Sequence, residues 1–570
     1  MRKGFKRSLG ALSAIGALGC AFSVMAKPVI HDAEFYVLKA QYESDWKTQD
    51  EEIQQKLAQL KEKHGTPPNI IHIMWDDTPV GEVGIPALQQ LRGFSTPNIN
   101  QLAAEGINFN RMYTEPSCTQ SRVAVITGRM PVRNGMTEVA FPYEYAGLAA
   151  SEVTLGEVLS EAGYATAFYG KAHMGDVEES YMTKQGFDEA VWSPYNQFPI
   201  IYGPQAEITG GVSPTTTNPE MYPDDPYDID KGWRVGQHPA ILAGTKGGDV
   251  KEIVQAGDIQ GWYQTMEDNK QRTLDFIDKS LDNDKPFFIA YWPQLIAFAP
   301  FPERETLSGG FLQEGLARFD PFVGQLMEHL KEKGISENTL VILMADNGPM
   351  THNGPPGMVE TLYRGGKGDF LEGGVRVPAM AWWPGMIEPG QTVGDILHET
   401  DLFTTFAMLA GAEKHIPRDR IIDGVDQSSL LINGNGNSRR DYVHIYTGEQ
   451  YAATVKGRFK RHWVGDLPGL SGASFYDLYN DPREVQPKML PMFTTKGMFN
   501  TMRARHEVWI EKYPHAEPAK GLPFTGIADA RPEVQQASKP RFDKDQLPFD
   551  PEKVMKKSKE YKTFDADWGM

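Results

Sequence analysis

The run Asn69-Ile-Ile-His-Ile-Met-Trp75, which leads straight into the acidic pair Asp76-Asp77, decides the fold class. A short, continuously apolar run is typical of a strand that is buried on both faces. Similar runs recur along the chain at Ala165–Tyr169, Pro286–Trp292, Leu340–Met344 and Val377–Trp383. Helical patterns lie between them at Asn98–Glu105, Leu155–Ala162, Ile259–Leu281 and Phe311–Lys333. This alternation predicts an α/β fold with a large, mostly parallel sheet and helices on both faces.

The segments on either side of this pattern have a different organisation. Residues 69–435 form the predicted α/β domain, and residues 27–68 precede it as a helical extension, because apolar positions recur every three or four residues from Ala33 to Lys63. These positions predict one or two helices. The stretch Ile201–Gly248 is rich in Pro and Gly and is too long for a simple connection, so we interpret it as a loop at the rim of a site.

A smaller unit follows the α/β domain over residues 436–520. Strand-like runs and a helical pattern occur there at Tyr442–Tyr446, Ala452–Val464, Ser474–Leu478 and Met498–Lys512. They predict a small antiparallel sheet with one packed helix. Residues 521–570 are a polar tail.

The N-terminus indicates export. Four basic residues within positions 2–7 precede the uncharged run Ser8–Ala26, which ends in small residues at the positions that a signal peptidase reads. Residues 1–26 are therefore predicted to be a signal peptide, and the mature protein to be periplasmic or secreted without stable membrane insertion. The alternatives are an uncleaved anchor and a lipoprotein site at Cys20, for which the preceding tripeptide is a weak match.

Composition excludes several classes of protein. Charged residues make up 23% and hydrophobic residues 40% of the 570 residues, as in globular proteins. The formal net charge of −18, without a compensating basic tract, would repel a phosphate backbone. Nucleic acid is therefore excluded as a partner.

Polar residues follow two of the predicted strands. Asp76 and Asp77 end the first, and Asp346 and Asn347 follow the run Leu340–Met344. In a parallel sheet the carboxyl ends of the strands form the binding edge, and hard divalent cations need several oxygen ligands. Each pair taken alone is more often a turn or a helix cap.

Cys118 is the only cysteine that remains after signal cleavage, and a lone thiol is ordinarily a small buried apolar group. Its surroundings, Glu115-Pro-Ser-Cys118-Thr-Gln-Ser-Arg122-Val-Ala-Val-Ile-Thr-Gly128-Arg129, resemble the motif of the sulfatase family within the alkaline-phosphatase-like superfamily. Further family-like motifs follow in the family's order: Tyr169-Gly-Lys171-Ala-His173-Met-Gly175, Gly366-Lys367 and Glu372-Gly-Gly-Val-Arg376-Val-Pro378. The resemblance spans roughly residues 69–480 and implies an alkaline-phosphatase-like fold.

The resemblance implies hydrolysis of a sulfate ester carried by a small molecule or a glycan. Cys118 would be oxidised to formylglycine by a maturation enzyme, and the hydrated aldehyde would attack sulfur and later expel sulfate. One divalent cation, calcium, would be held by Asp76, Asp77, Asp346, Asn347 and the group derived from Cys118.

The resemblance also implies roles for four other residues. Arg122, one helical turn after Cys118, would fix the cysteine-derived side chain. Lys171 and Lys367 would neutralise sulfate oxygens, and Lys367 would also assist the leaving oxygen. His173, titrating near neutrality, would act as the base that expels sulfate.

Two departures from the family pattern keep alternatives open. Gln120 stands where many sulfatases carry the Pro or Ala that the maturation enzyme reads. Gln294, Ala297 and Phe298 occupy a region that normally holds a histidine near the leaving group, and His352 or His238 could substitute for it. The alternatives are a phosphodiesterase or phosphonate-ester hydrolase of the same superfamily, and a degenerate protein that binds sulfated ligands without turning them over.

Overall fold

The computed structural model describes residues 28–140, 146–195, 239–255, 258–294, 310–351, 362–433, 437–464, 474–513 and 515–520. The predicted signal peptide and the polar tail lie outside these residues. So do Ala297, Phe298, His352 and His238.

A large, mostly parallel sheet forms the centre of the molecule, as predicted. Its strand order is β11-β2-β10-β9-β1-β8-β4-β5-β6-β7, and β12 also pairs with β2. The central strand β1 (Asn69–Trp75) runs parallel to both β8 (Phe287–Trp292) and β9 (Thr339–Ala345). Parallel pairing continues through β4 (Ala165–Lys171) to β5 (Glu189–Ser193). Every residue of β1, β8 and β9 is buried, which is why these strands read as continuous apolar runs.

Antiparallel strands lie on both flanks of the sheet. On one flank, β10 (Arg376–Trp382) is antiparallel to β9 and to β2 (Ile107–Tyr113), and the short strands β11 (Gln391–Val393) and β12 (Leu397–His398) pair with β2. On the other flank, β6 (Pro239–Thr245) and β7 (Lys251–Gln255) form an antiparallel hairpin beside β5. The interpretation of Ile201–Gly248 as one long loop is therefore wrong for the residues of β6. Residues 201–238 lie outside the described part of the chain.

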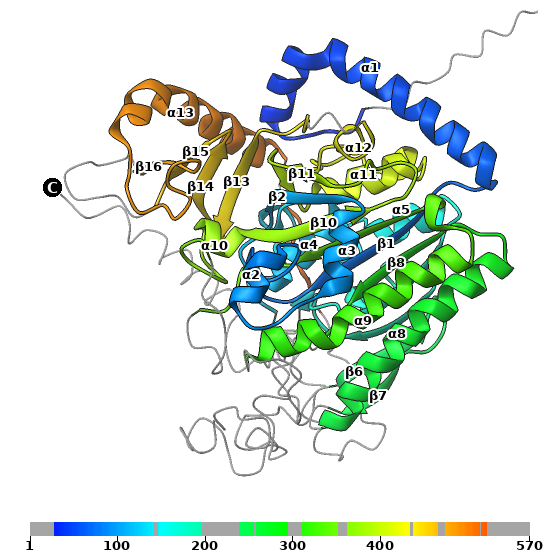
Figure 1. The fold of residues 1–570 in the computed structure, drawn as a ribbon. Coiled ribbons are helices and arrows are strands. Elements are labelled where there is room, and N and C mark those ends of the chain that lie inside the picture. The colour runs from blue at the N-terminus through cyan, green and yellow to red at the C-terminus, as the bar shows by residue number, and fades with distance from the viewer. Residues whose placement is uncertain are drawn as a thin grey trace, which may run out of the picture.

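Helices cover both faces of the sheet (Figure 1). On one face, α3 (Pro97–Ala104) and α8 (Ile259–Asp282) both contact α9 (Phe311–Glu332). On the other, α4 (Cys118–Thr127), α5 (Leu155–Glu161) and α11 (Asp401–Leu409) contact one another. The remaining short elements are α2 (Pro86–Leu91), α10 (Glu372–Val375), α12 (Ser428–Ile432) and the two-residue strands β3 (Ala146–Gly147) and β17 (Ala519–Lys520).

The C-terminal part forms a separate four-stranded antiparallel sheet with one long helix, as predicted. The strands are β13 (Tyr442–Thr447), β14 (Gln450–Lys456), β15 (Phe459–His462) and β16 (Ser474–Asp477), and α13 (Met489–Lys512) packs against β16. The run Ala452–Val464, expected as one strand, is a hairpin, because Gly457 turns the chain at φ 58°. The helix also begins nine residues before the predicted Met498, at Met489.

The N-terminal extension is a single helix, α1 (Ala33–His64), which contacts α12 and α13. It ends at Gly65, whose φ of 79° and N–H bond to Lys61 O form a left-handed cap. Within the described residues, no helix is both long enough and apolar enough to cross a membrane.

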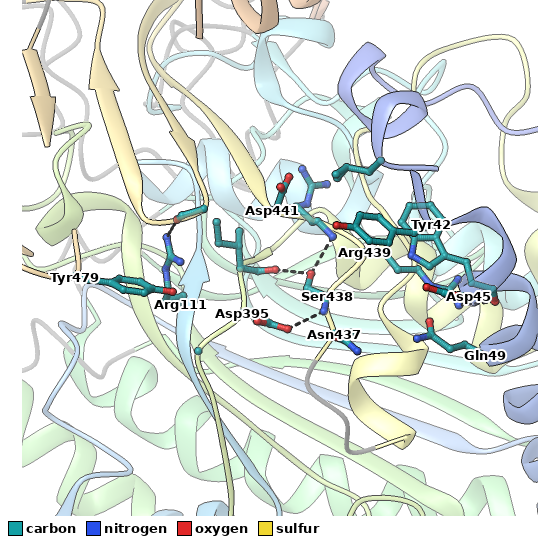
Figure 2. Close-up of a pocket in the computed structure, with 16 residues that line it drawn as sticks. Tyr42, Asp45, Gln49, Arg111, Asp395, Asn437, Ser438, Arg439, Asp441 and Tyr479 are labelled. Atoms are coloured by element: carbon teal, nitrogen blue, oxygen red, sulfur yellow. Dashed lines mark hydrogen bonds between the residues drawn. The ribbon is translucent and has the colours of Figure 1, made fainter. Parts of the chain in front are cut away.

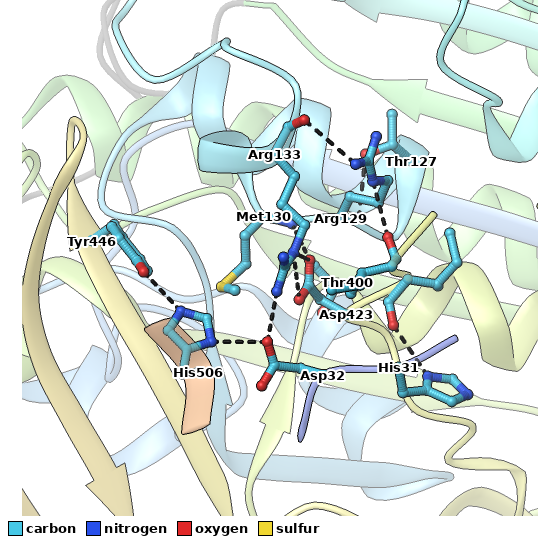
Figure 3. A network of polar contacts seen from close by, with 12 residues as sticks. His31, Asp32, Thr127, Arg129, Met130, Arg133, Thr400, Asp423, Tyr446 and His506 are labelled. Atoms are coloured by element: carbon cyan, nitrogen blue, oxygen red, sulfur yellow. Dashed lines mark hydrogen bonds and ion pairs between the residues drawn. The ribbon is translucent and has the colours of Figure 1, made fainter. Parts of the chain in front are cut away.

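A buried polar network joins four segments that are distant in the sequence (Figure 3). Asp32, just before α1, accepts hydrogen bonds from Arg133 Nη2 at 2.6 Å and from His506 Nδ1 at 2.8 Å. Arg133 Nε also contacts Asp423 Oδ2 at 2.8 Å. Removing one partner of such a buried pair leaves an uncompensated charge, at a cost of about 3–5 kcal/mol. The network therefore fixes α1 and α13 against the loop that follows α4.

Candidate active site

The two acidic strand ends meet at one edge of the main sheet. Trp75 of β1 lies opposite Ala345 of β9 in parallel register, so the residues that follow emerge side by side. The Asp346 N–H donates to Trp75 O, and the Asp77 N–H donates to Asp346 Oδ1, both at 3.0 Å. Asp77 has a positive φ of 49°, a conformation that Asp tolerates better than most residues. The strand pairing thus brings together the two pairs singled out in the sequence.

Two lysines from separate elements contact these carboxylates. Lys171 ends β4, and its Nζ lies 2.8 Å from Asp76 Oδ1. Lys367 Nζ lies 2.7 Å from Asp77 Oδ1, which also accepts a hydrogen bond from Asn347 Nδ2 at 2.6 Å. All of these side chains are buried except that of Lys367, which is slightly exposed.

Cys118 is the first residue of α4, and Arg122 lies one turn later. Arg122 bridges the two acidic strand ends: its Nη2 contacts Asp76 Oδ1 at 2.5 Å and Asp346 Oδ2 at 2.8 Å. Its Nη1 donates to Lys171 O at 2.6 Å. Burial alone would lower the pKa of Arg122, but Asp346, Asp76 and Cys118 together raise it. Arg122 therefore fixes the carboxylates as well as lying beside the cysteine.

The amino end of α4 suits an anion. The first N–H groups of a helix have no intrahelical partner and carry the positive end of the helix dipole.

Gly348, which follows Asp346 and Asn347, allows its backbone to approach Gly373 closely. A Cβ at position 348 would lie 1.7 Å from Gly373 O. That close approach packs the strand end against the segment that carries Lys367.

His173 lies within the same cluster in a strained backbone conformation, with φ 55°. Its Nε2 is 3.0 Å from Ala140 O, and since a carbonyl can only accept, Nε2 carries the hydrogen. Nδ1 therefore keeps its lone pair, and it is buried without a hydrogen-bond partner among the described residues. Burial, followed by the charges of Lys171, Arg122 and Lys367, holds the pKa of His173 well below its ordinary value. The expectation that it titrates near neutrality is therefore wrong: it is neutral at neutral pH.

The acidic residues fit a hard divalent cation. Asp77 Oδ2 and Asn347 Oδ1 are buried, and no donor among the described residues reaches them. Burial, with a contribution from the charges of Asp76 and Asp77, raises the pKa of Asp346 to about 7. Burial would also raise the pKa of Asp76, but Lys171 and Arg122 hold it well below its usual range. Carboxylate and amide oxygens are the donors that calcium prefers.

Among the described residues, Asp32–His444–His506 and Glu115–His398–Glu399 are buried groups whose ligand atoms are close enough together for a metal. Asp32 is already neutralised by Arg133. In the second group, burial raises the pKa of Glu115 to about 8 and that of Glu399 well above its usual value, which disfavours the ionised carboxylates that a cation binds. Neither group therefore offers the open, ionised oxygen ligands that a hard cation needs.

Sequence reasoning missed the segment that orients His173. Ala140 donates its N–H to Thr119 Oγ1 at 3.0 Å, and Thr137 O accepts from Gln120 Nε2 at 2.6 Å. Gln120, noted in the sequence only as a departure from the family pattern, thus fastens residues 137–140, whose last carbonyl sets the tautomer of His173. A proline at this position has no amide with which to do so. Only the polar side chain of Gln120 hints at this role in the sequence.

The low pKa of His173 predicts the shape of the pH profile. The neutral imidazole is the form that accepts a proton, so kcat/KM should stay constant as pH falls from 8 and decline only below pH 6.5, the ordinary histidine value. The profile should be measured at saturating calcium, because protons also compete for Asp346. An acid limb above pH 6.5 that does not move with calcium concentration would contradict this assignment.

The chain is similar in sequence to known proteins. A family model described as Sulfatase matches residues 68–294 and 312–412. Human arylsulfatase A is 35% identical over 486 residues, which cover 83% of this chain and 86% of the relative. N-acetylgalactosamine-6-sulfatase of Canis lupus familiaris is 32% identical over 415 residues, which cover 70% of this chain and 72% of the relative.

A solved structure agrees with these matches. The PsFucS1 sulfatase from Pseudoalteromonas sp. is similar with a TM-score of 0.72 and 28% identity, covering 83% of this chain and 96% of that one. The chain therefore belongs to the sulfatase family and is a sulfuric ester hydrolase.

Proposed function

We propose that this enzyme hydrolyses sulfate esters through a formylglycine formed from Cys118, beside a calcium ion held by Asp76, Asp77, Asp346 and Asn347. The observation that carries the proposal is the convergence of Cys118, at the start of a helix, with three basic and three acidic side chains at one sheet edge. The formal charges of these six side chains cancel. A divalent cation would therefore leave a positive surplus, which suits an anionic sulfate group.

A formylglycine and a divalent cation would supply part of the chemistry. The hydrated aldehyde would supply one hydroxyl for attack on sulfur and another for release of sulfate, and the cation would supply charge that polarises the sulfate. The cysteine-derived side chain would complete the shell of oxygen ligands. The maturation enzyme that forms the aldehyde is a required partner under this proposal.

The chain's own residues provide binding, orientation and proton transfer. We assign Lys171 and Lys367 to pairing with sulfate oxygens, because both reach the acidic strand ends, while Arg122 holds these strand ends in place. The free lone pair on His173 Nδ1 can take the proton of a hydroxyl beside it, since Nε2–H is engaged with Ala140 O. Its pKa should rise when the anionic substrate partly offsets the neighbouring positive charges.

We propose a sulfated sugar as the natural substrate and the periplasm or exterior as the site of action. The relatives named N-acetylgalactosamine-6-sulfatase support a sugar ester, and the signal-like residues 1–26 support export.

Release of inorganic sulfate separates the competing functions. Mature enzyme should release sulfate from p-nitrophenyl sulfate and from N-acetylgalactosamine 6-sulfate, and it should act far more slowly on bis-p-nitrophenyl phosphate. A preference for the phosphodiester would support the phosphodiesterase alternative. Binding of both sulfates without turnover, in protein whose Cys118 is converted, would support the non-catalytic binder.

A further inference from the structure

A groove of about 320 Å³ lies apart from the strand ends that carry the predicted catalytic and metal-binding residues, and none of those residues lines it. It opens between α1, the polypeptide at residues 394–396 and 437–441, and the small C-terminal sheet (Figure 2). Both α1 and the C-terminal sheet lie outside the residues that the family model matches. The groove is therefore built largely from residues outside the part of the chain that the family model matches.

Aromatic side chains form two opposite sides of the groove (Figure 2). Tyr42 and Trp46 come from α1, and Tyr479 follows β16. The side chains of Tyr42 and Tyr479 are 48% and 64% exposed, which is unusual for such large rings. The Trp46 ring is held by stacking under the Arg439 guanidinium at 5.6 Å, and that of Tyr479 lies 5.7 Å from Arg111. Tyr42 and Tyr479 are thus exposed, and the rings of Trp46 and Tyr479 are held in place by arginine side chains.

Polar groups with fixed positions lie between the two aromatic sides. Asp395 Oδ2 accepts the Ser438 N–H at 2.9 Å, and Arg439 pairs with Asp426 at 3.1 Å and with Asp50 at 2.5 Å. Both donors and acceptors are present, and acidic and basic side chains are mixed. A strongly anionic ligand such as nucleic acid does not fit this lining. A neutral ligand with many hydroxyl groups does.

We propose that this groove binds a sugar unit of a glycan, at a distance from the sulfate ester that reacts. A pyranose ring has an apolar C–H face that can stack on a tyrosine or tryptophan and a rim of hydroxyls that pair with preorganised donors and acceptors. The volume is within the range of small-ligand sites, which begins at about 300 Å³. The choice of a glycan rests on the proposed sulfatase function, whereas sugar binding by the groove can be measured without turnover.

The test uses full-length protein with Cys118→Ala, so that no glycan is consumed. Binding is screened on an array of sulfated and unsulfated glycans, and affinities for the glycans that bind are then measured by calorimetry. Adding Tyr42→Ala and Tyr479→Ala should weaken glycan binding about tenfold, since each aromatic contact contributes a factor of about three or more. The loss should be as large for chemically desulfated oligosaccharides as for sulfated ones.

Tyr36→Ala is the matched control, because Tyr36 is also a half-exposed tyrosine of α1 but stacks on Trp509 instead of lining the groove. It should leave affinity unchanged, and all variants should keep the melting temperature of the parent. The proposal is overturned if no glycan binds, or if the Tyr42/Tyr479 variant binds every glycan as well as the control does. If either of these results is obtained but the wild-type enzyme hydrolyses sulfated sugars, the groove proposal is wrong and the proposed function is unaffected.

Discussion

Replacing Cys118 by alanine is expected to abolish turnover while leaving the fold intact. Loss of a nucleophile typically lowers kcat by on the order of 10⁴-fold or more, and no other side chain among the described residues of this cluster could supply the hydrated aldehyde. The Cys118 side chain is small and fully buried, so its truncation should cost about 1 kcal/mol of stability. Sulfate release and a thermal melt measure the two effects.

Ser117→Ala is the control for this variant. Ser117 precedes the cysteine and makes no side-chain cap hydrogen bond to α4. It should keep both turnover and melting temperature, provided that its Cys118 is converted to the same extent. Substantial sulfate release by the Cys118→Ala variant would contradict the assigned role of Cys118.

Removing calcium, or one of its ligands, is expected to have the second-largest effect. A bound cation contributes several kcal/mol of charge stabilisation in hydrolysis, which is about 1,000-fold in rate. Chelated enzyme and an Asp77→Asn variant should both lose activity to about this degree. Adding calcium to chelated wild-type enzyme should restore the rate and raise the melting temperature, because a ligand that binds only the folded state stabilises it. Calcium should have neither effect on the Asp77→Asn variant.

The pKa of Asp346 gives this prediction a pH dependence. Without a cation its pKa is about 7, and the cation binds the ionised carboxylate. Calcium affinity should therefore fall as pH drops below about 7.

Asp320→Asn is the control for the Asp77→Asn variant. Asp320 is a buried carboxylate whose partners among the described residues are N–H groups of Asn98 and Ile99, so the Asp320→Asn variant should lose stability but still bind calcium. Full activity and unchanged melting after exhaustive chelation would show that the site is wrongly assigned.

The central sheet could be predicted from the sequence because its inner strands are buried on both faces. β1, β8 and β9 read as apolar runs, and the polar residues after them mark the edge where they end. Strands β6 and β7 form a hairpin at the edge of the sheet and lack that continuous apolar signal, and β6 also lies within the Pro/Gly-rich stretch Ile201–Gly248. The break at Gly457 was missed because the turn between β14 and β15 is only two residues long, so that a single glycine marks it in the sequence.

The positions of the site residues followed from motifs and from strand order, but their partners did not. The Arg122 bridge between Asp76 and Asp346 depends on how α4 crosses the sheet, which no local pattern encodes. The pKa of His173 depends on its burial and on the charges of Lys171, two residues away, and of Arg122 and Lys367, which are distant in the sequence. The contact of Gln120 with Thr137 could be found only in the folded chain.

Mass spectrometry of the peptide that contains Cys118, from protein purified from its native host, tests the central proposal most directly. The proposal predicts a peptide in which the thiol is replaced by an aldehyde, and specific activity that rises in proportion to the converted fraction. Alkylation of the sample would label only the unconverted thiol. A fully active preparation in which every copy of the peptide carries an unmodified, alkylated cysteine would contradict it.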